Sequence, residues 1–241
     1  MNLHVLRQGF IVLGLLLWPA VLHAAAPPVG QISRVTGKNV LEAAPPGGVA
    51  RKLAAGDAVF AGERIRTGAG TSTQIEFTDK TRFILGPDTE FEVEQYRRKQ
   101  DGSAEEAFIS RIFKGAFRFV SGVIAHSKPG NMQVATAVAT IGIRGTHVEG
   151  EVTERQEKNG VTVDSSAKVV LLEPEGSEKN SSVVVENKFG SVVIDKPGYG
   201  TEIPDEKSPP SPVKRMQLRT IDNVLRAIRS PVRQGGPIRR P

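Results

Sequence analysis

Alternation of hydrophobic and polar residues dominates the middle of the chain. From Thr73 to Phe77, β-branched or aromatic side chains occupy every second position, and polar side chains lie between them. This two-residue period is typical of a half-buried β-strand. Thr81–Leu85 follows the short Asp79-Lys80 connection, and Phe91–Gln95 resumes the alternation. Helix start and stop signals are missing here, so the pattern predicts consecutive antiparallel strands.

The same pattern continues beyond residue 105. Phe108–Lys114 and Ala116–Val120 are predicted as two strands of a hairpin that turns at Gly115. Between Met132 and Val152 the apolar residues are small or β-branched, which favours strand over helix. Val161–Leu172 is predicted as a further strand.

A last hairpin is predicted from Val183–Val185 and Ser191–Ile194, which flank a polar turn. No fixed repeat period joins these units, so a regular solenoid is not demonstrated. We therefore predict an all-β protein, built as an antiparallel sandwich or a solenoid-like β domain. The domain is expected to be elongated, to run from Val29 to Ile203, and to have two lobes that meet near Glu154.

The composition changes after Ile203. Four prolines predict an extended linker over residues 204–214, because proline fixes its φ angle and lacks a backbone N–H donor. Residues 215–241 are expected to form a short basic amphipathic helix followed by a disordered tail. The apolar stripe of this helix recurs at spacings of three and four residues, at Leu218, Ile221, Leu225 and Ile228.

Residues 1–26 have the pattern of a secretory signal peptide. Arg7 precedes an apolar run from Phe10 to Leu22, and three alanines follow it. As a helix, that run would rise only about 20 Å, too short for the hydrocarbon core of a bilayer. We expect an exported protein, periplasmic or secreted, with an uncleaved membrane anchor as the alternative.

Charge is distributed unevenly along the chain. Residues 27–212 hold 23 Lys and Arg against 25 Asp and Glu, a net charge of −2 (23 − 25), whereas residues 213–241 hold eight against one, a net charge of +7 (8 − 1). The near-neutral body argues against a nucleic-acid partner. The basic segment either contacts an anionic lipid, an acidic protein face or another envelope polyanion, or its helix docks on the β body with its arginines in solvent. Its candidate contact residues are Arg215, Arg219, Arg226 and Arg229.

Several short motifs from Leu53 to Glu149 stand in a characteristic order. Leu-Ala-Ala-Gly-Asp at 53–57 is followed by Ile-Arg-Thr-Gly at 65–68 and Ile-Glu-Phe-Thr-Asp at 75–79. Leu-Gly-Pro-Asp-Thr at 85–89 and Lys114-Gly115 come next, and Thr-Ile-Gly-Ile-Arg-Gly-Thr at 140–146 closes the series. In this order and spacing the segment resembles the FecR domain of bacterial periplasmic and cell-surface signalling proteins.

The resemblance implies an all-β domain outside the cytoplasm that contacts proteins and does no chemistry. We assign it to residues 27–152, with residues 153–203 as a β extension packed on it. Its signature residues are expected to be structural; they are Gly56, Asp57, Thr67, Asp79, Gly86, Gly115, Thr140, Arg144, Gly145 and Thr146.

Two departures from the family pattern matter. The family places glycine where Lys80 stands, so we expect a bulge or a turn other than type I′, which would force Lys80 to positive φ. Regulatory members carry a cytoplasmic helical segment ahead of a transmembrane helix, whereas only nine residues precede the apolar run here. This difference argues against direct contact with a cytoplasmic sigma factor.

Candidate chemistry is sparse. Arg144 is expected to satisfy carbonyls or a carboxylate such as Asp79 or Asp57. His126 and His147 lack further ligands at metal spacing, and cysteine is absent. Glu90, Glu92 and Glu94 share one strand face, where a solvated surface explains them better than acid–base work or cation binding. No nucleophile–base pair is evident.

We therefore expect no catalytic residue, cofactor or metal. The predicted function is that of a non-catalytic, exported protein-binding or scaffold module of the cell envelope. The partner would be an envelope protein or an anionic surface. The alternative is a periplasmic component of a cell-surface signalling system that regulates a sigma factor.

Overall fold

The computed structural model describes residues 26–99, 105–127, 130–173 and 181–216. Within these residues the regular structure is almost entirely strand, and one short helix, α1 (Ile124–Ser127), interrupts it. The all-β prediction is confirmed. The expected signal peptide, apart from Ala26, and the expected C-terminal helix and tail beyond Met216 lie outside the described residues.

The strands form two sheets that face each other across one core. Sheet A has the order β4-β1-β6-β7-β9-β12-β15-β18-β19. Its strands are β1 (Gly30–Thr36), β4 (Ala58–Val59), β6 (Ser72–Phe77), β7 (Arg82–Leu85), β9 (Ala107–Val120), β12 (His147–Thr153), β15 (Ser166–Leu172), β18 (Tyr199–Ile203) and β19 (Lys214–Arg215).

Sheet B has the order β3-β2-β5-β8-β9-β10-β11-β16-β17. In addition to β9, it contains β2 (Leu41–Ala44), β3 (Arg51–Lys52), β5 (Arg64–Thr67), β8 (Glu90–Arg97), β10 (Met132–Ala135), β11 (Thr140–Arg144), β16 (Ser182–Asn187) and β17 (Gly190–Ile194). Neighbouring strands in both sheets are antiparallel, except that β10 runs parallel to β9.

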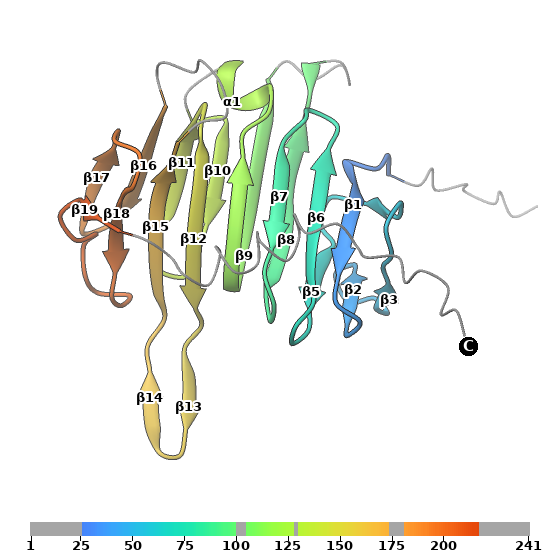
Figure 1. Cartoon of the computed structure of the whole chain (residues 1–241), viewed down its shortest axis with the longest axis horizontal. Coiled ribbons are helices and arrows are strands. Elements are labelled where there is room, and N and C mark those ends of the chain that lie inside the picture. Colours follow the sequence, from blue (N-terminus) through green and yellow to red (C-terminus); the bar gives the residue numbers. More distant parts are fainter. Residues whose placement is uncertain (1–25, 100–104, 128–129, 174–180, 217–241) are drawn as a thin grey trace, which may run out of the picture.

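The chain advances along the sandwich as it passes between the sheets. Strands follow one another along the long axis of the molecule, from β1 at one end to β17 and β18 at the other (Figure 1). The structure thus combines both predicted forms: two packed antiparallel sheets, and an order along the axis that mostly follows the sequence.

Strand β9 belongs to both sheets. Ala107–Lys114 pairs with β8 in sheet B. In sheet A, Gly115–Val120 pairs with β12 on one side, and its last four residues also pair with β7 on the other. The predicted hairpin at Gly115 is therefore wrong. Gly115 has a φ of 100°, so the strand bends there and continues from one sheet into the other.

The predicted hairpin of residues 73–85 is confirmed as β6 and β7. Its three-residue connection closes with hydrogen bonds from Lys80 N to Phe77 O (2.9 Å) and from Phe77 N to Thr81 O (2.9 Å). Lys80 adopts a φ of 72°. This is the three-residue loop in which the last residue takes the left-handed conformation of a bulge, so a bulge replaces the type I′ turn while Lys80 keeps a positive φ.

The core has two chemically different halves. Phenylalanines from both sheets fill the first half, with ring centroids 4.7 Å apart for Phe77 and Phe108 and 4.7 Å for Phe83 and Phe91. Aliphatic residues fill the second half, where Val148, Val169 and Val185 are all fully buried. All belong to one continuous cluster of buried residues.

The predicted strand over residues 161–172 is divided in two. Val161–Val163 is β14, which pairs with β13 (Gln156–Lys158), and Ser166–Leu172 is β15 in sheet A. The β13–β14 hairpin projects beyond the edge of the sandwich (Figure 1). The predicted last hairpin is confirmed as β16 and β17.

The proline-rich segment after Ile203 lies along the body. Ser211 N donates to Glu202 O (2.9 Å), and Asn187 Nδ2 donates to Ser208 O (2.8 Å). Residues 214–215 then form β19 beside β18, so Arg215 is in a strand and not in the helix expected from residue 215. No helix among the described residues is long and apolar enough to span a bilayer.

Candidate functional site: signature junctions and exposed surfaces

Three signature residues meet where β9 changes sheets. The Thr67 hydroxyl donates to Gly86 O (2.6 Å) and accepts from Thr89 N (2.9 Å). Gly86 N donates to Ala116 O (2.7 Å), the residue after Gly115. A Cβ at Gly115 would lie only 2.5 Å from the Cα of Thr89. These contacts join β5, the β7–β8 turn and the bend of β9.

Asp79 organises a second junction. Its carboxylate is fully buried and accepts hydrogen bonds from the Thr81 hydroxyl (2.7 Å), from Thr81 N (3.1 Å) and from Ile124 N (3.4 Å) at the start of α1. Its backbone O accepts from Val123 N (2.9 Å). Asp79 therefore ties the β6–β7 turn to the segment between β9 and α1.

Tyr96 on β8 completes this junction. Its phenol oxygen accepts from Asp79 N (2.8 Å), and its O–H donates to Asp79 Oδ1 (3.3 Å). Burial raises the pKa of the Tyr96 phenol well above its ordinary value, and the nearby Asp79 charge adds to the rise while the hydrogen bond with Thr78 opposes it. The neutral phenol thus serves as both donor and acceptor.

A third junction contains the closing motif of the series. Thr146 is fully buried, its N donates to the Ser121 hydroxyl (2.8 Å), and its O accepts from Ser121 N (3.1 Å). Gly145 has a φ of 51°, and its O accepts from the Ser181 hydroxyl (2.8 Å). The turn between β11 and β12 is thereby fixed to the end of β9 and the start of β16.

Arg144 is exposed, unlike its neighbours in the motif. We expected Arg144 to satisfy backbone carbonyls or a carboxylate such as Asp79 or Asp57, but the structure places it against neither of these two carboxylates. Asp79 is bound as described above, and Asp57 Oδ2 accepts from Ala54 N (2.7 Å) within its own turn. The expected pairing is therefore wrong for both carboxylates.

The remaining signature residues also lie in turns or at the ends of strands. Gly56 has a φ of 95°, and its N donates to Ile32 O (2.8 Å). Thr140 begins β11, opposite Ala135 on one side and Glu186 on the other. Apart from Arg144, the signature positions are thus turns and strand junctions, distributed over the body and not gathered in one cleft.

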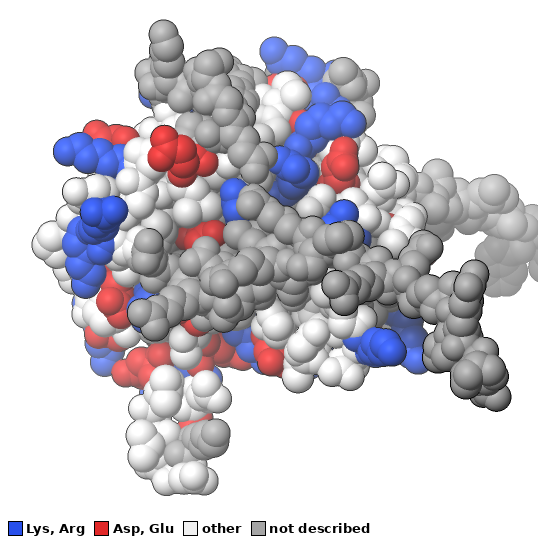
Figure 2. Space-filling view, in the orientation of Figure 1, with Lys and Arg blue, Asp and Glu red and all other residues white. Residues whose placement is uncertain are grey.

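The three glutamates of β8 lie on the outer face of sheet B, where basic side chains from neighbouring strands meet them. Arg64 lies 3.3 Å from a carboxylate oxygen of both Glu90 and Glu92, and Lys114 lies 3.7 Å from Glu90. Arg111 pairs with Glu94. These carboxylates are part of a surface ion-pair network. Acidic and basic side chains are also intermixed on the face of the molecule seen in Figure 2.

The next candidates are the possible metal ligands and the basic contact residues. Within the described ranges, no group of three or more His, Cys, Asp or Glu could hold a metal ion. His147 is buried at the start of β12. Arg215 is exposed on β19. Arg219, Arg226 and Arg229 lie outside the described residues.

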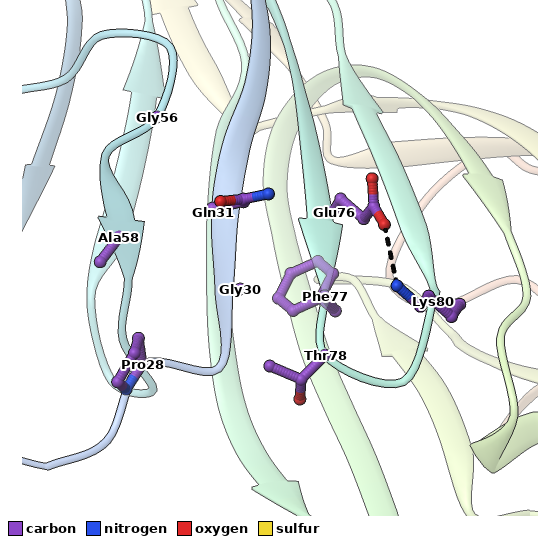
Figure 3. Close-up of a pocket in the computed structure, with 9 residues that line it drawn as sticks. All are labelled: Pro28, Gly30, Gln31, Gly56, Ala58, Glu76, Phe77, Thr78 and Lys80. Carbon is purple, nitrogen blue, oxygen red and sulfur yellow. Dashed lines mark ion pairs between the residues drawn. The ribbon is translucent and has the colours of Figure 1, made fainter.

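An open pocket of about 430 Å³ lies at the end of the sandwich where β1, β4 and β6 meet. Phe77 and Thr78 line it, and at its rim Lys80 Nζ lies 3.5 Å from a carboxylate oxygen of Glu76 (Figure 3). The ion pair is solvent-exposed, and the lining offers no convergent set of polar groups that would define a ligand.

The β13–β14 hairpin is the surface feature that our sequence reasoning missed. Its turn is Asn159-Gly160, with φ angles of 53° and 75°, the pair that a type I′ turn requires. This dipeptide, followed by the β-branched run of residues 161–163, was the available signal. Val161 and Val163 remain 64% and 42% exposed.

Comparisons with known proteins agree with the motif series. Residues 63–168, which include the projecting hairpin, match the model of the family described as FecR protein. No curated protein matches the chain.

Two crystal structures of a "putative anti-sigma factor" from Parabacteroides distasonis ATCC 8503 match 67% of this chain, each with 15% sequence identity and a TM-score of 0.47. The match spans 64% and 63% of that protein's chain, less than two thirds of its length. The ordered motifs and the family match over residues 63–168 together show that this chain contains a FecR domain.

Proposed function

We propose that this chain is a non-catalytic protein-binding module of the bacterial cell envelope, and that the β13–β14 hairpin is its contact arm. The distribution of the signature residues supports the first part. Thr67, Asp79 and Thr146 are buried and bonded within the fold. The family signature therefore belongs to the scaffold of the fold, and the outward-facing elements are left for contact with a partner.

The hairpin is the observation that carries the proposal. It projects from the body, and its two valines are exposed although burial would favour them by about 1.5–3 kcal/mol each. An isolated two-stranded hairpin is only marginally stable in water, and this hairpin adds nothing to the core. A role in contact with a partner would account for it. On the face seen in Figure 2 most of the hairpin is neither acidic nor basic, and its sequence from 156 to 163 holds one acidic and one basic residue, Glu157 and Lys158. This absence of net charge suits a protein surface better than a polyanion.

Export rests on the sequence of residues 1–26, whose charged start, apolar run and small residues are those of a secretory signal. The proposed location is the periplasm or the exterior. The absence of cysteine is compatible with that location, because the continuous core stabilises the body without disulfides.

A second candidate function is regulation of a cell-surface signalling system. The FecR match supports a role in signal regulation. In this case the arm would contact a membrane-bound component of the signalling system, and loss of the arm would change the output of that system and not only a binding equilibrium.

In-cell photo-crosslinking tests the proposal. A photoreactive amino acid replaces Val161 on the arm or, as the matched control, Val193 on β17; these valines are 64% and 58% exposed. We expect position 161 of the full chain to crosslink one envelope protein identified by mass spectrometry, and position 193 to give none.

A second variant shortens the arm by joining Arg155 to Asp164 through Asn-Gly. We expect this variant to fold normally and to lose the partner in a pull-down. Retained binding by the shortened variant would remove the arm from the proposal. A full chain that crosslinks nothing at either position, or only cytoplasmic proteins, would refute the envelope-binding function.

A further inference from the structure

A row of residues crosses the outer face of sheet A. In register, Ile84 lies opposite Arg118, Arg118 opposite Glu149, Glu149 opposite Val170, and Val170 opposite Gly200. We call these five residues the outer row. Their sequence neighbours Phe83, Phe117, Val148 and Val169 are fully buried in the core. Because side chains alternate along a strand, the outer row points away from the core.

The outer row is nevertheless buried. Ile84 and Arg118 are each 8% exposed, Glu149 is 4% exposed and Val170 is 2% exposed. The outer face of sheet B behaves differently: its cross-strand pair Val184 and Val193 is 36% and 58% exposed. An open antiparallel sheet leaves its outer face solvated, as sheet B does. The outer row of sheet A is therefore covered, whereas the pair Lys168 and Glu202 on the same face keeps side-chain exposures of 41% and 36%.

The described chain ends at the edge of this row. β19 places Lys214 opposite Gly200, and Met216 N donates to Gly198 O (2.9 Å). A Cβ at Gly200 would lie 3.0 Å from Met216 Sδ and 3.0 Å from Val170 Cγ2. Met216 thus lies on the outer face of sheet A, beside Val170.

The residues that follow Met216 have a suitable length and pattern. Four strand spacings separate β18 from β7, through β15, β12 and β9. At about 4.8 Å each they make about 19 Å. A helix of twelve residues, 217–228, rises about 18 Å. Leu218, Ile221 and Leu225 give that helix one apolar side, which can meet Ile84 and Val170.

We propose that residues 217–228 dock in cis across the outer row of sheet A. Of the two interpretations of the basic segment, contact with an external anionic partner or docking on the β body, this proposal selects the second. The docked segment shields one face of the sandwich and leaves sheet B and the hairpin arm accessible. The inference concerns a different surface from the arm, so either proposal can fail without the other.

Thiol labelling tests the docking, since the chain contains no cysteine. Val170→Cys places a single thiol in the outer row, and Val193→Cys places one on the open face of sheet B as the matched control. Each is made in the full chain and in a chain ending at Met216, and reaction with a maleimide is followed over time. We expect truncation to speed labelling at position 170 at least about tenfold and to leave position 193 unchanged.

Two further measurements keep the test decisive. Ile84→Cys repeats it at the other end of the row if Val170→Cys does not fold. The full-length triple variant L218S/I221S/L225S retains every charge, and we expect it to expose position 170 as truncation does. Equal labelling rates in full and truncated chains would overturn the proposal. So would protection that disappears on dilution, which would indicate a second copy, or protection that requires added anionic vesicles.

Discussion

Lys80 occupies a backbone conformation that glycine adopts at lower cost. Its φ of 72° lies in the left-handed region, where a Cβ costs about 1–2 kcal/mol. Its only described side-chain interaction is an exposed ion pair with Glu76, of little energetic value. We predict that Lys80→Gly raises the free energy of unfolding by about 1 kcal/mol, measured by urea denaturation.

Lys80→Ala is the control for this substitution. It removes the amine but keeps the Cβ, so we expect its stability to stay within about 0.5 kcal/mol of the parent. A gain from alanine as large as that from glycine would show that the charge, and not the backbone conformation, is the unfavourable feature.

The buried phenol of Tyr96 should make the protein less stable at alkaline pH. Its pKa is raised in the folded state by burial, whereas in the unfolded chain it ionises near pH 10. Its contribution is thus complete below about pH 10 and declines above it, because only the unfolded state then releases the proton. Tyr96→Phe loses the hydrogen bonds to Asp79 and should be less stable at pH 7.

Above pH 10, the stability of Tyr96→Phe should fall less steeply with pH than that of the parent protein. Urea midpoints of the parent and of Tyr96→Phe, measured from pH 8 to pH 11, give the two slopes. Parallel curves would contradict the assignment, since other titrating groups are common to both proteins.

The residue scale also shows where sequence reasoning succeeds and where it stops. The bulge beside Lys80 was predictable from the sequence, because turn chemistry depends on adjacent residues, but the positive φ of Lys80, which we expected the bulge to avoid, was not. The contacts of Asp79 with Tyr96 and Ile124 were not, since they join positions 17 and 45 residues apart. The exposure of Arg144 was likewise invisible, because its solvent contact depends on the arrangement of β11 and β16.

At the scale of elements, the bend of β9 depends on Gly115. A Cβ there would meet the Cα of Thr89 at 2.5 Å, a backbone atom that cannot rotate away. We predict that Gly115→Ala lowers the free energy of unfolding by about 3 kcal/mol or prevents folding, through combined steric and backbone strain. Thermal unfolding of purified protein gives the comparison.

Gly56→Ala is the matched control for that prediction. Gly56 has a φ of 95°, close to the 100° of Gly115, but no atom lies within 4 Å of its Cβ position. We expect a loss of about 1 kcal/mol, from backbone strain alone. Equal losses at the two positions would mean that the contact with Thr89 is unimportant.

Elements were predictable as far as alternation reveals them. Period two identified β6 and β8, and turn residues between apolar runs identified β7, β16 and β17. It misread Gly115, because the alternation of apolar and polar residues looks the same whether the chain turns back at a glycine or continues through it into the other sheet. It also fused β14 with β15, although the boundary between them is the polar pair Asp164-Ser165, because alternation alone does not show where a strand leaves the sandwich.

At the scale of the whole molecule, the sandwich grows along one axis while its core remains continuous. The phenylalanine-rich half and the aliphatic half share one cluster of buried residues from Val29 to Ile203. β9 and β12 join them, because β12 pairs with β9 on one side and with β15 on the other. If the molecule were divided into two lobes near Glu154, as we expected, this strand pairing would be interrupted there.

The two tyrosines of the chain allow a direct test of this continuity. Tyr96 packs against Phe77 and Phe108 in the first half, and Tyr199 begins β18 in the second. Fluorine-19 NMR of 3-fluorotyrosine-labelled protein reports both sites in one urea titration. Because the sheets and core are continuous across residue 154, we predict that the two resonances lose their folded signals at the same urea concentration. Separate midpoints would mean that β12 and β15 part before the core melts, and that the molecule consists of two lobes that unfold independently.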